Sequence, residues 1–145
     1  MALPEPVPGL VVRYAYLWRE EYLRGKEEGR KDRPCAVIVV TTGEAGDRVV
    51  TVLPITRTPP PKPALAVEIP TPTKRRLGLD DDRSWVLLNE ANRFAWPGPD
   101  LRPTKPGKPT EVTYGLLPRA LFKEVTAKLA AAIEARLVRV VPRSE

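Results

Sequence analysis

The chain contains no histidine, and this absence excludes several kinds of site at once. There is no serine–histidine triad, no histidine general base and no histidine metal ligand. Cysteine is nearly absent as well, because Cys35 is the single one among 145 residues. One cysteine forms neither an internal disulfide nor a cysteine-rich metal centre. We therefore expect no metal and no cofactor, and we interpret Cys35 as a small apolar packing residue.

Long apolar segments are also missing. No apolar run approaches the length of a transmembrane helix, and the first ten residues, MALPEPVPGL, lack a basic start followed by an apolar stretch. Neither GxGxxG nor GxxxxGK[ST] occurs, so a phosphate-cradling glycine loop is not predicted. We expect a cytoplasmic protein that does not bind a membrane.

The residues that are present favour one folded, basic domain. Hydrophobic residues make up 42% of the chain. Proline and glycine together number 27 of 145 residues, about 19%, which is below the level of roughly 25–30% that is typical of disorder. We expect a single domain over residues 1–145, with residues 1–9 as a flexible arm. Lysine and arginine number 24 against 18 acidic residues, which favours anionic partners, most commonly nucleic acid.

The apolar pattern predicts short strands followed by one helix. β-Branched and aromatic residues predict strands over residues 10–18, 33–41, 48–56, 64–70 and 84–96, the last one bent near residues 89–92. Helix formers follow over residues 118–137, and their apolar stripe predicts burial of Leu121, Val125, Leu129 and Ile133. The fold class expected is mainly β with α: a small SH3-like antiparallel barrel with a C-terminal helix.

Two places at strand ends carry residues suited to binding phosphate. Arg33 precedes Pro34 at the start of a buried strand, and an arginine fork pairs with phosphate oxygens. Thr56, Arg57 and Thr58 follow the strand LPIT and supply two hydroxyls and a charge. The alternatives are a surface arginine bonded to a carbonyl or carboxylate, and a simple strand exit.

A third place combines an amide, a cation and a ring. Asn92, Arg93 and Trp96 lie in NEANRFAWPG, and this mixture of groups is suited to reading exposed RNA bases. The alternative is a bent strand with Trp96 in the core.

In their order along the chain, these motifs resemble the MazF/PemK family of toxin endoribonucleases from toxin–antitoxin pairs. The family opens with a glycine-led strand, a glutamate- and glycine-containing loop, and an "RP" before an apolar strand, which Gly9, KEEG and RPCAVIVV match here. PITRT resembles the family's "IT" motif, and LGLDDDRSWVLLNEANRFAW resembles its next strand and turn. A closing helix follows. Leu10 and Arg57 depart from the family's acidic and small residues.

The resemblance implies an enzyme and its residues. Arg33 and Thr56 fall on the family's catalytic arginine and threonine, and Glu27 or Glu28 is the candidate general base, of which we select Glu28. The activity implied is sequence-specific, metal-independent cleavage of single-stranded RNA to 2′,3′-cyclic phosphate and 5′-hydroxyl ends. The expected RNA-binding residues are Arg30, Lys31, Arg57, Thr58, Asn92, Arg93 and Trp96. A cognate antitoxin and a homodimer are the partners that the resemblance implies.

Two other functions are compatible with the same barrel. One is a gyrase-binding toxin of the CcdB type, whose activity depends on its C-terminal tail. The other is a basic barrel that binds RNA or a protein without cutting. The endoribonuclease hypothesis is distinguished from both by a dependence on Arg33 and Thr56.

Overall fold

The computed structural model describes residues 3–26 and 31–143 of the chain. The strands in this part are β1 (Leu10–Tyr14), β2 (Arg33–Thr42), β3 (Arg48–Thr56), β4 (Ala66–Glu68), β5 (Trp85–Leu87), β6 (Glu90–Trp96), β7 (Thr113–Leu116) and β8 (Arg139–Pro142). The helices are α1 (Arg19–Leu23), α2 (Thr71–Leu77) and α3 (Arg119–Glu134), with a 3-10 turn, η1 (Pro63–Leu65). The two longest strands, β2 and β3, are rich in valine, a residue that fits a half-buried pleated surface.

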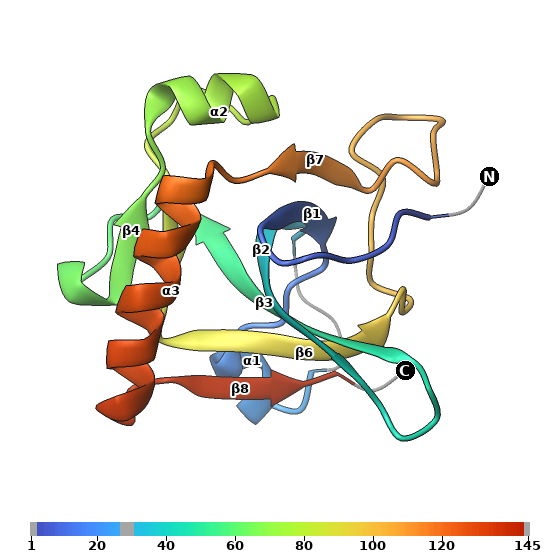
Figure 1. Cartoon of the computed structure of the whole chain (residues 1–145), viewed down its shortest axis with the longest axis horizontal. Coiled ribbons are helices and arrows are strands. Elements are labelled where there is room, and N and C mark those ends of the chain that lie inside the picture. The colour runs from blue at the N-terminus through green and yellow to red at the C-terminus, as the bar shows by residue number, and fades with distance from the viewer. Residues whose placement is uncertain (1–2, 27–30, 144–145) are drawn as a thin grey trace.

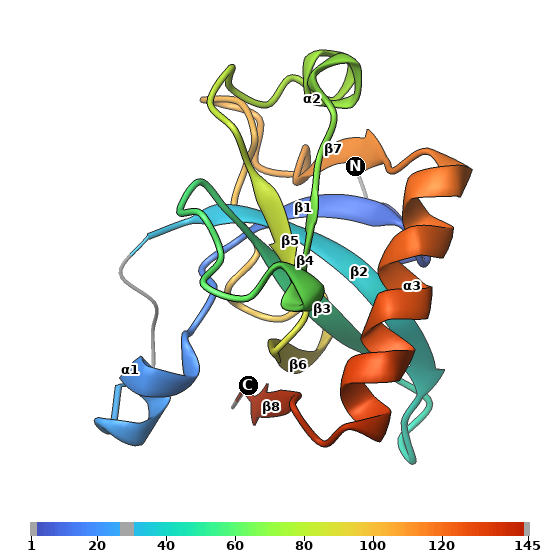
Figure 2. The ribbon, with the colours of Figure 1, turned by 90° about the vertical axis from the view of Figure 1, so that its left-hand side faces the viewer.

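The strands form one curled sheet with α3 along one side (Figure 1). Their order is β4-β5-β3-β2-β1-β7, and β6 pairs with both β3 and β8. Each of these pairs is antiparallel except β6–β8, which is parallel because α3 carries the chain back to the same end of the sheet. Figure 2 shows the curl of the sheet beside α3. The prediction of a mainly β fold, compatible with a small barrel and followed by a helix, is confirmed.

Strand β2 lies between two hydrophobic clusters, because successive side chains of a strand point to opposite faces. Ala36 and Ile38 belong to one cluster, and Cys35 and Val37 belong to the other. All four side chains are buried, which explains the uninterrupted apolar run in the sequence. The packing role predicted for Cys35 is confirmed, and burial raises the pKa of its thiol.

Helix α3 packs on the sheet with Leu121, Val125 and Leu129, which are buried as predicted. The predicted burial of Ile133 is wrong, because this side chain is 57% exposed and Ala132 is buried instead. With 3.6 residues per turn, each four-residue step rotates a side chain by about 40°, so three steps from Leu121 move Ile133 about 120° away from the core face. Eleven residues from Leu121, Ala132 returns to within about 20° of that face.

Several boundaries differ from the predicted ones. The first strand ends at Tyr14 instead of residue 18, and the strand over 64–70 is shortened to β4. The bend predicted near residues 89–92 agrees with the structure, in which the segment 84–96 forms two strands, β5 and β6. Strands β7 and β8 were not predicted, because four residues each carry too little alternation to be recognised. In the described part of the chain, no helix is long and apolar enough to cross a membrane.

The described residues of the N-terminal segment lie against the sheet. The Gly9 N–H donates to the carbonyl oxygen of Val37 at 2.7 Å, and Trp96 Nε1 donates to the carbonyl oxygen of Pro4 at 3.1 Å. Gly9 adopts a φ of +92°, a conformation that favours glycine. The expected flexible arm over residues 1–9 is therefore attached to the sheet from Pro4 onward.

Candidate functional site

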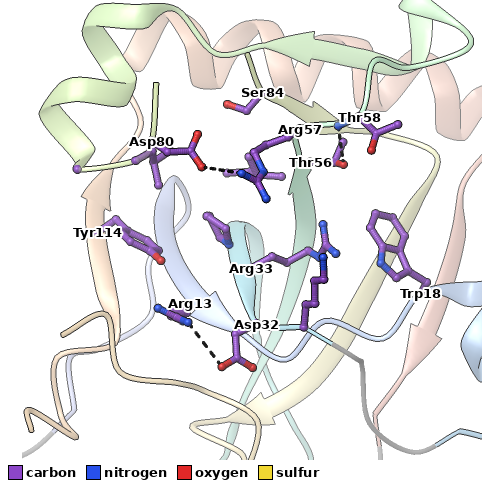
Figure 3. A pocket seen from close by; sticks show the side chains of 15 residues that line it. Arg13, Trp18, Asp32, Arg33, Thr56, Arg57, Thr58, Asp80, Ser84 and Tyr114 are labelled. Carbon is purple, nitrogen blue, oxygen red and sulfur yellow. Dashed lines mark hydrogen bonds and ion pairs between the residues drawn. The ribbon is translucent and has the colours of Figure 1, made fainter. Parts of the chain in front are cut away.

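A cavity of about 580 Å³ opens where β2 begins and β3 ends (Figure 3). These strands are antiparallel, and their register pairs Cys35 with Pro54. Arg33 lies two residues before Cys35, and Thr56 lies two residues after Pro54. In an antiparallel pair, both positions are at the same end of the sheet. Five of the residues predicted from the sequence line this cavity: Lys31, Arg33, Thr56, Arg57 and Thr58.

Arg33 is the first residue of β2 and extends into the cavity. Its backbone is fixed by pairing with Tyr14 of β1, and Pro34 restricts the backbone that follows. Its guanidinium carbon lies 4.7 Å from the centroid of the Trp18 ring, a cation–π contact. Its Nε atom is buried and has no hydrogen-bond partner within the described residues. The alternative of an arginine bonded to a nearby carbonyl or carboxylate is not what the described residues show.

Thr56 is the last residue of β3 and is buried next to β5, where it pairs with Trp85. Its hydroxyl oxygen accepts a hydrogen bond of 3.1 Å from the backbone N–H of Thr58. Because this contact uses the oxygen as an acceptor, the hydroxyl hydrogen is available to donate into the cavity. Thr56 therefore offers a fixed, neutral hydrogen-bond donor beside the charged fork of Arg33.

Arg57 lies at the cavity rim in contact with an acidic turn. Its Nη1 atom lies 3.4 Å from Asp80 Oδ2 and 3.1 Å from Asp82 Oδ2. All three side chains are more than half exposed, so solvent weakens these ion pairs. A phosphate group can replace the carboxylates as the partner of Arg57.

The opposite wall contains residues that the sequence analysis missed. Arg13 and Tyr114 line the cavity on the side away from Trp18 (Figure 3). The carboxylate of Asp32 lies 3.9 Å from Nη2 of Arg13 and 3.6 Å from Nε of Arg102. Burial raises the pKa of the Tyr114 hydroxyl, and the positive charge of Arg13 opposes that rise. A charged residue inside the apolar run LVVRYAYLW was the one available signal for Arg13. No pattern singles out Tyr114, because β7 itself is too short to recognise.

The third predicted place does not line this cavity. Asn92 is fully buried, and its amide bonds to the backbone of Leu17, so the prediction that it contacts RNA is wrong in this structure. Trp96 is partly buried against the core, where it stacks on Phe94 at 6.2 Å. Arg93 is exposed on β6, away from the cavity. The alternative of a bent strand with Trp96 in the core describes this segment better.

Two predicted residues, Glu28 and Arg30, lie outside the described residues. Among those that are described, four cations and two carboxylates line the cavity: Arg13, Lys31, Arg33, Arg57, Asp32 and Asp80. No three histidine, cysteine, aspartate or glutamate side chains of the described ranges gather into a metal-binding group. The cavity is thus basic, and it contains a charged hydrogen-bond donor, the guanidinium of Arg33, and a neutral one, the hydroxyl of Thr56.

The comparison with known families decides the identity. The profile of the PemK-like, MazF-like toxin of type II toxin–antitoxin systems matches residues 18–97, more than half of the chain. The chain belongs to this family. No curated protein matches the chain significantly.

The match to the PemK-like toxins covers the central part of the cavity. Trp18, Arg33 and Thr56 fall inside the matched residues, whereas Arg13, Tyr114 and α3 fall outside them. Type II toxins act in pairs with antitoxins, so membership of the family implies an antitoxin as a partner. The resemblance identified from the sequence motifs is confirmed.

Proposed function

We propose that this protein is a sequence-specific, metal-independent endoribonuclease that acts on single-stranded RNA. The observation that supports the proposal is that one basic cavity contains both Arg33 and Thr56, in a chain of the PemK-like toxin family. These two residues are the ones to which the resemblance assigns catalysis. Their side chains offer three donors suited to one phosphate group: two in the arginine fork and one hydroxyl.

In the proposed reaction the RNA supplies its own nucleophile. The 2′-oxygen forms a bond to the adjacent phosphorus, and the bond from phosphorus to the 5′-oxygen breaks. A base takes the proton of the 2′-hydroxyl, and the leaving 5′-oxygen gains a proton. The products are a 2′,3′-cyclic phosphate and a 5′-hydroxyl. DNA lacks the 2′-hydroxyl, so it remains intact.

Negative charge gathers on the non-bridging phosphate oxygens during this reaction. The planar fork of Arg33 donates two hydrogen bonds to them, and the Thr56 hydroxyl donates another. Both side chains extend from strand ends whose backbones are already paired, so little reorganisation is needed when charge develops. Glu28 is kept as the candidate base.

The remaining cations are proposed to bind the RNA backbone. Lys31 and Arg57 line the cavity, and Arg30 and Arg93 remain candidate RNA contacts on the grounds of the sequence alone. Binding through phosphates weakens as salt rises. An acidic segment of the antitoxin is expected to compete with RNA for these cations, because the same charges attract both.

We also propose that the protein is a homodimer, as the family resemblance implies. Light scattering at micromolar concentration should give twice the chain mass of 16.1 kDa. A monomeric mass would contradict this part of the proposal.

The experiment that tests the activity compares wild type with Arg33→Ala and Arg33→Lys, with EDTA present. Arg33→Ala should fold and lose about 10²–10³-fold in cleavage rate, the usual cost of removing one preorganised donor. Arg33→Lys should not restore the rate, because an ammonium group lacks the two-pronged geometry. A wild-type rate in Arg33→Ala would overturn the catalytic assignment. Growth inhibition without RNA cleavage would instead favour the CcdB type of toxin.

A further inference from the structure

We propose that Trp18 is a positioning residue for the Arg33 guanidinium, and that Asn92 and Glu90 of β6 hold it in place. The inference rests on the proposed RNA cleavage. It concerns Trp18, which contacts Arg33, and two residues of β6 that bond to the neighbours of Trp18. The NEANRFAW segment is thereby given a structural role in place of RNA binding.

The contact between Trp18 and Arg33 leaves the arginine donors unused. The guanidinium carbon lies 4.7 Å from the ring centroid, within the range of a cation–π interaction. The ring face offers no oxygen or nitrogen acceptor, so this contact does not occupy the guanidinium N–H groups in conventional hydrogen bonds. The buried Nε has no hydrogen-bond partner in the described residues, and no described ion pair involves Arg33. Trp18 thus orients the fork and leaves its hydrogen bonds to the substrate.

The backbone just before Trp18 is fixed from β6. Asn92 Oδ1 accepts a hydrogen bond from the Leu17 N–H at 2.9 Å, and Asn92 Nδ2 donates to the Leu17 carbonyl oxygen at 2.8 Å. The Asn92 side chain is fully buried, so water does not compete for these two bonds. Because the buried Asn92 amide bonds to both the N–H and the carbonyl oxygen of Leu17, it restricts the backbone that leads to the next residue, Trp18.

Glu90 bonds to residues on either side of Leu17 and Trp18. Its Oε1 atom accepts hydrogen bonds from the Tyr16 hydroxyl and from the Arg19 N–H, both at 3.0 Å. The Tyr16 ring in turn meets the Trp18 ring edge-on, with 5.1 Å between the centroids and 70° between the planes. Glu90 therefore contacts residues before and after Trp18, and one of them, Tyr16, contacts the Trp18 ring.

The Trp18 backbone also begins a helix. Its N–H donates to Glu21 Oε1 at 3.2 Å, three residues along, as in a helix-capping box. The indole is therefore fixed through its backbone, its neighbours and its ring. Such an anchored ring beside a catalytic arginine is what preorganisation requires.

The test is a double-mutant cycle that uses Trp18→Leu, Arg33→Ala and the double variant, with single-turnover RNA cleavage as the readout. Trp18→Leu should lower the cleavage rate about tenfold at saturating enzyme, and change the RNA affinity less than twofold. In the Arg33→Ala background the same substitution should have no further effect, because its influence passes through Arg33. Trp18→Phe keeps an aromatic face and should recover most of the rate.

Other results would overturn the inference. Equal losses in both backgrounds would show that Trp18 acts independently of Arg33. A loss in RNA affinity with an unchanged rate would show that Trp18 stacks on a base. If Trp18→Leu does not fold, as judged by circular dichroism, the cycle is run with Trp18→Met, which also lacks an aromatic face, and equal losses in both backgrounds there would also overturn the inference. Failure of the proposed function is distinct, because wild type would then not cut RNA or Arg33→Ala would cut normally.

Discussion

The backbone N–H of Thr58 donates a hydrogen bond to the hydroxyl oxygen of Thr56, with 3.1 Å between the two atoms. This bond uses the hydroxyl oxygen as an acceptor, so the hydroxyl hydrogen remains available for donation to a group bound in the cavity that Thr56 lines. The side chain of Thr56 is thereby suited to stabilise charge on a phosphate oxygen.

Replacing Thr56 by valine should remove this donor with little change in volume. We expect the RNA cleavage rate to fall about 10²-fold, the order expected for one lost donor to a developing oxyanion. Thr56→Ser keeps the hydroxyl and should retain most of the rate. The two variants are compared by single-turnover kinetics, with thermal unfolding as the control for folding. Equal rates in Thr56→Val and wild type would show that the hydroxyl has no part in the reaction.

Arg57 should act on RNA binding more than on cleavage. We expect Arg57→Ala to weaken RNA binding and to reduce the slope of log affinity against log salt by about 0.7, the value for one phosphate contact on a single strand. Asp80→Asn removes a competing carboxylate and should tighten binding. The matched control is Arg83→Ala, since Arg83 is another exposed arginine paired with a carboxylate, Glu68, outside the cavity. An unchanged salt slope in Arg57→Ala would contradict the assignment.

Glu90 should make stability depend on pH. Burial raises the pKa of its carboxyl above the ordinary value of 4.5, although the hydrogen bonds from the Arg19 N–H and the Tyr16 hydroxyl oppose the rise. A raised pKa means that the folded state binds the proton more tightly than the unfolded state. The stability from Glu90 is therefore fully present below pH 4.5 and is lost as the pH rises through the folded-state pKa.

Glu90→Gln keeps an oxygen acceptor without the charge. Its melting temperature relative to wild type should therefore increase between pH 4 and pH 7. Thermal unfolding of the two proteins across this range checks the sign. A difference that stays constant, or that falls with rising pH, would contradict the burial of this carboxyl.

Arg143 and Asp100 form a buried ion pair near the C-terminal end of the described residues. The distance from Arg143 Nη2 to Asp100 Oδ2 is 2.8 Å, and the two side chains are 2% and 8% exposed. Arg143→Met leaves a carboxylate buried without this partner and should lower the free energy of unfolding by about 3–5 kcal/mol. The control is Arg48→Met, which removes an exposed pair and should cost less than about 1 kcal/mol. Urea unfolding that gives equal costs would contradict the prediction.

The longest patterned segments were predictable from the sequence. The apolar run from Cys35 and the valine-rich run before Thr56 are long enough to identify two central strands, and α3 follows from its helix formers. Arg33 and Thr56 were singled out as polar residues at strand ends, whereas their joint role came from the family resemblance. The antiparallel pairing of β2 with β3, which places both residues at one end of the sheet, is a finding of the structure.

The rest depended on tertiary structure. Asn92 has the residue type of an RNA-reading side chain, but burial and two backbone bonds give it a structural role that no local pattern reveals. Tyr114 enters the cavity from a strand of four residues that is distant in sequence from Arg33. Ile133 was misplaced because a repeat of exactly four residues drifts around a helix of 3.6 residues per turn.

The central claim is that the cavity around Arg33 and Thr56 cleaves RNA through the substrate's 2′-hydroxyl. Mass spectrometry of the fragment ends tests it most directly, with purified protein, single-stranded RNA and EDTA, beside DNA of the same sequence. The account predicts 2′,3′-cyclic phosphate and 5′-hydroxyl ends for wild type, far fewer such ends for Arg33→Ala, and intact DNA. Fragments with 5′-phosphate ends, cleavage of the DNA, or no cleavage of any RNA by wild type would contradict it.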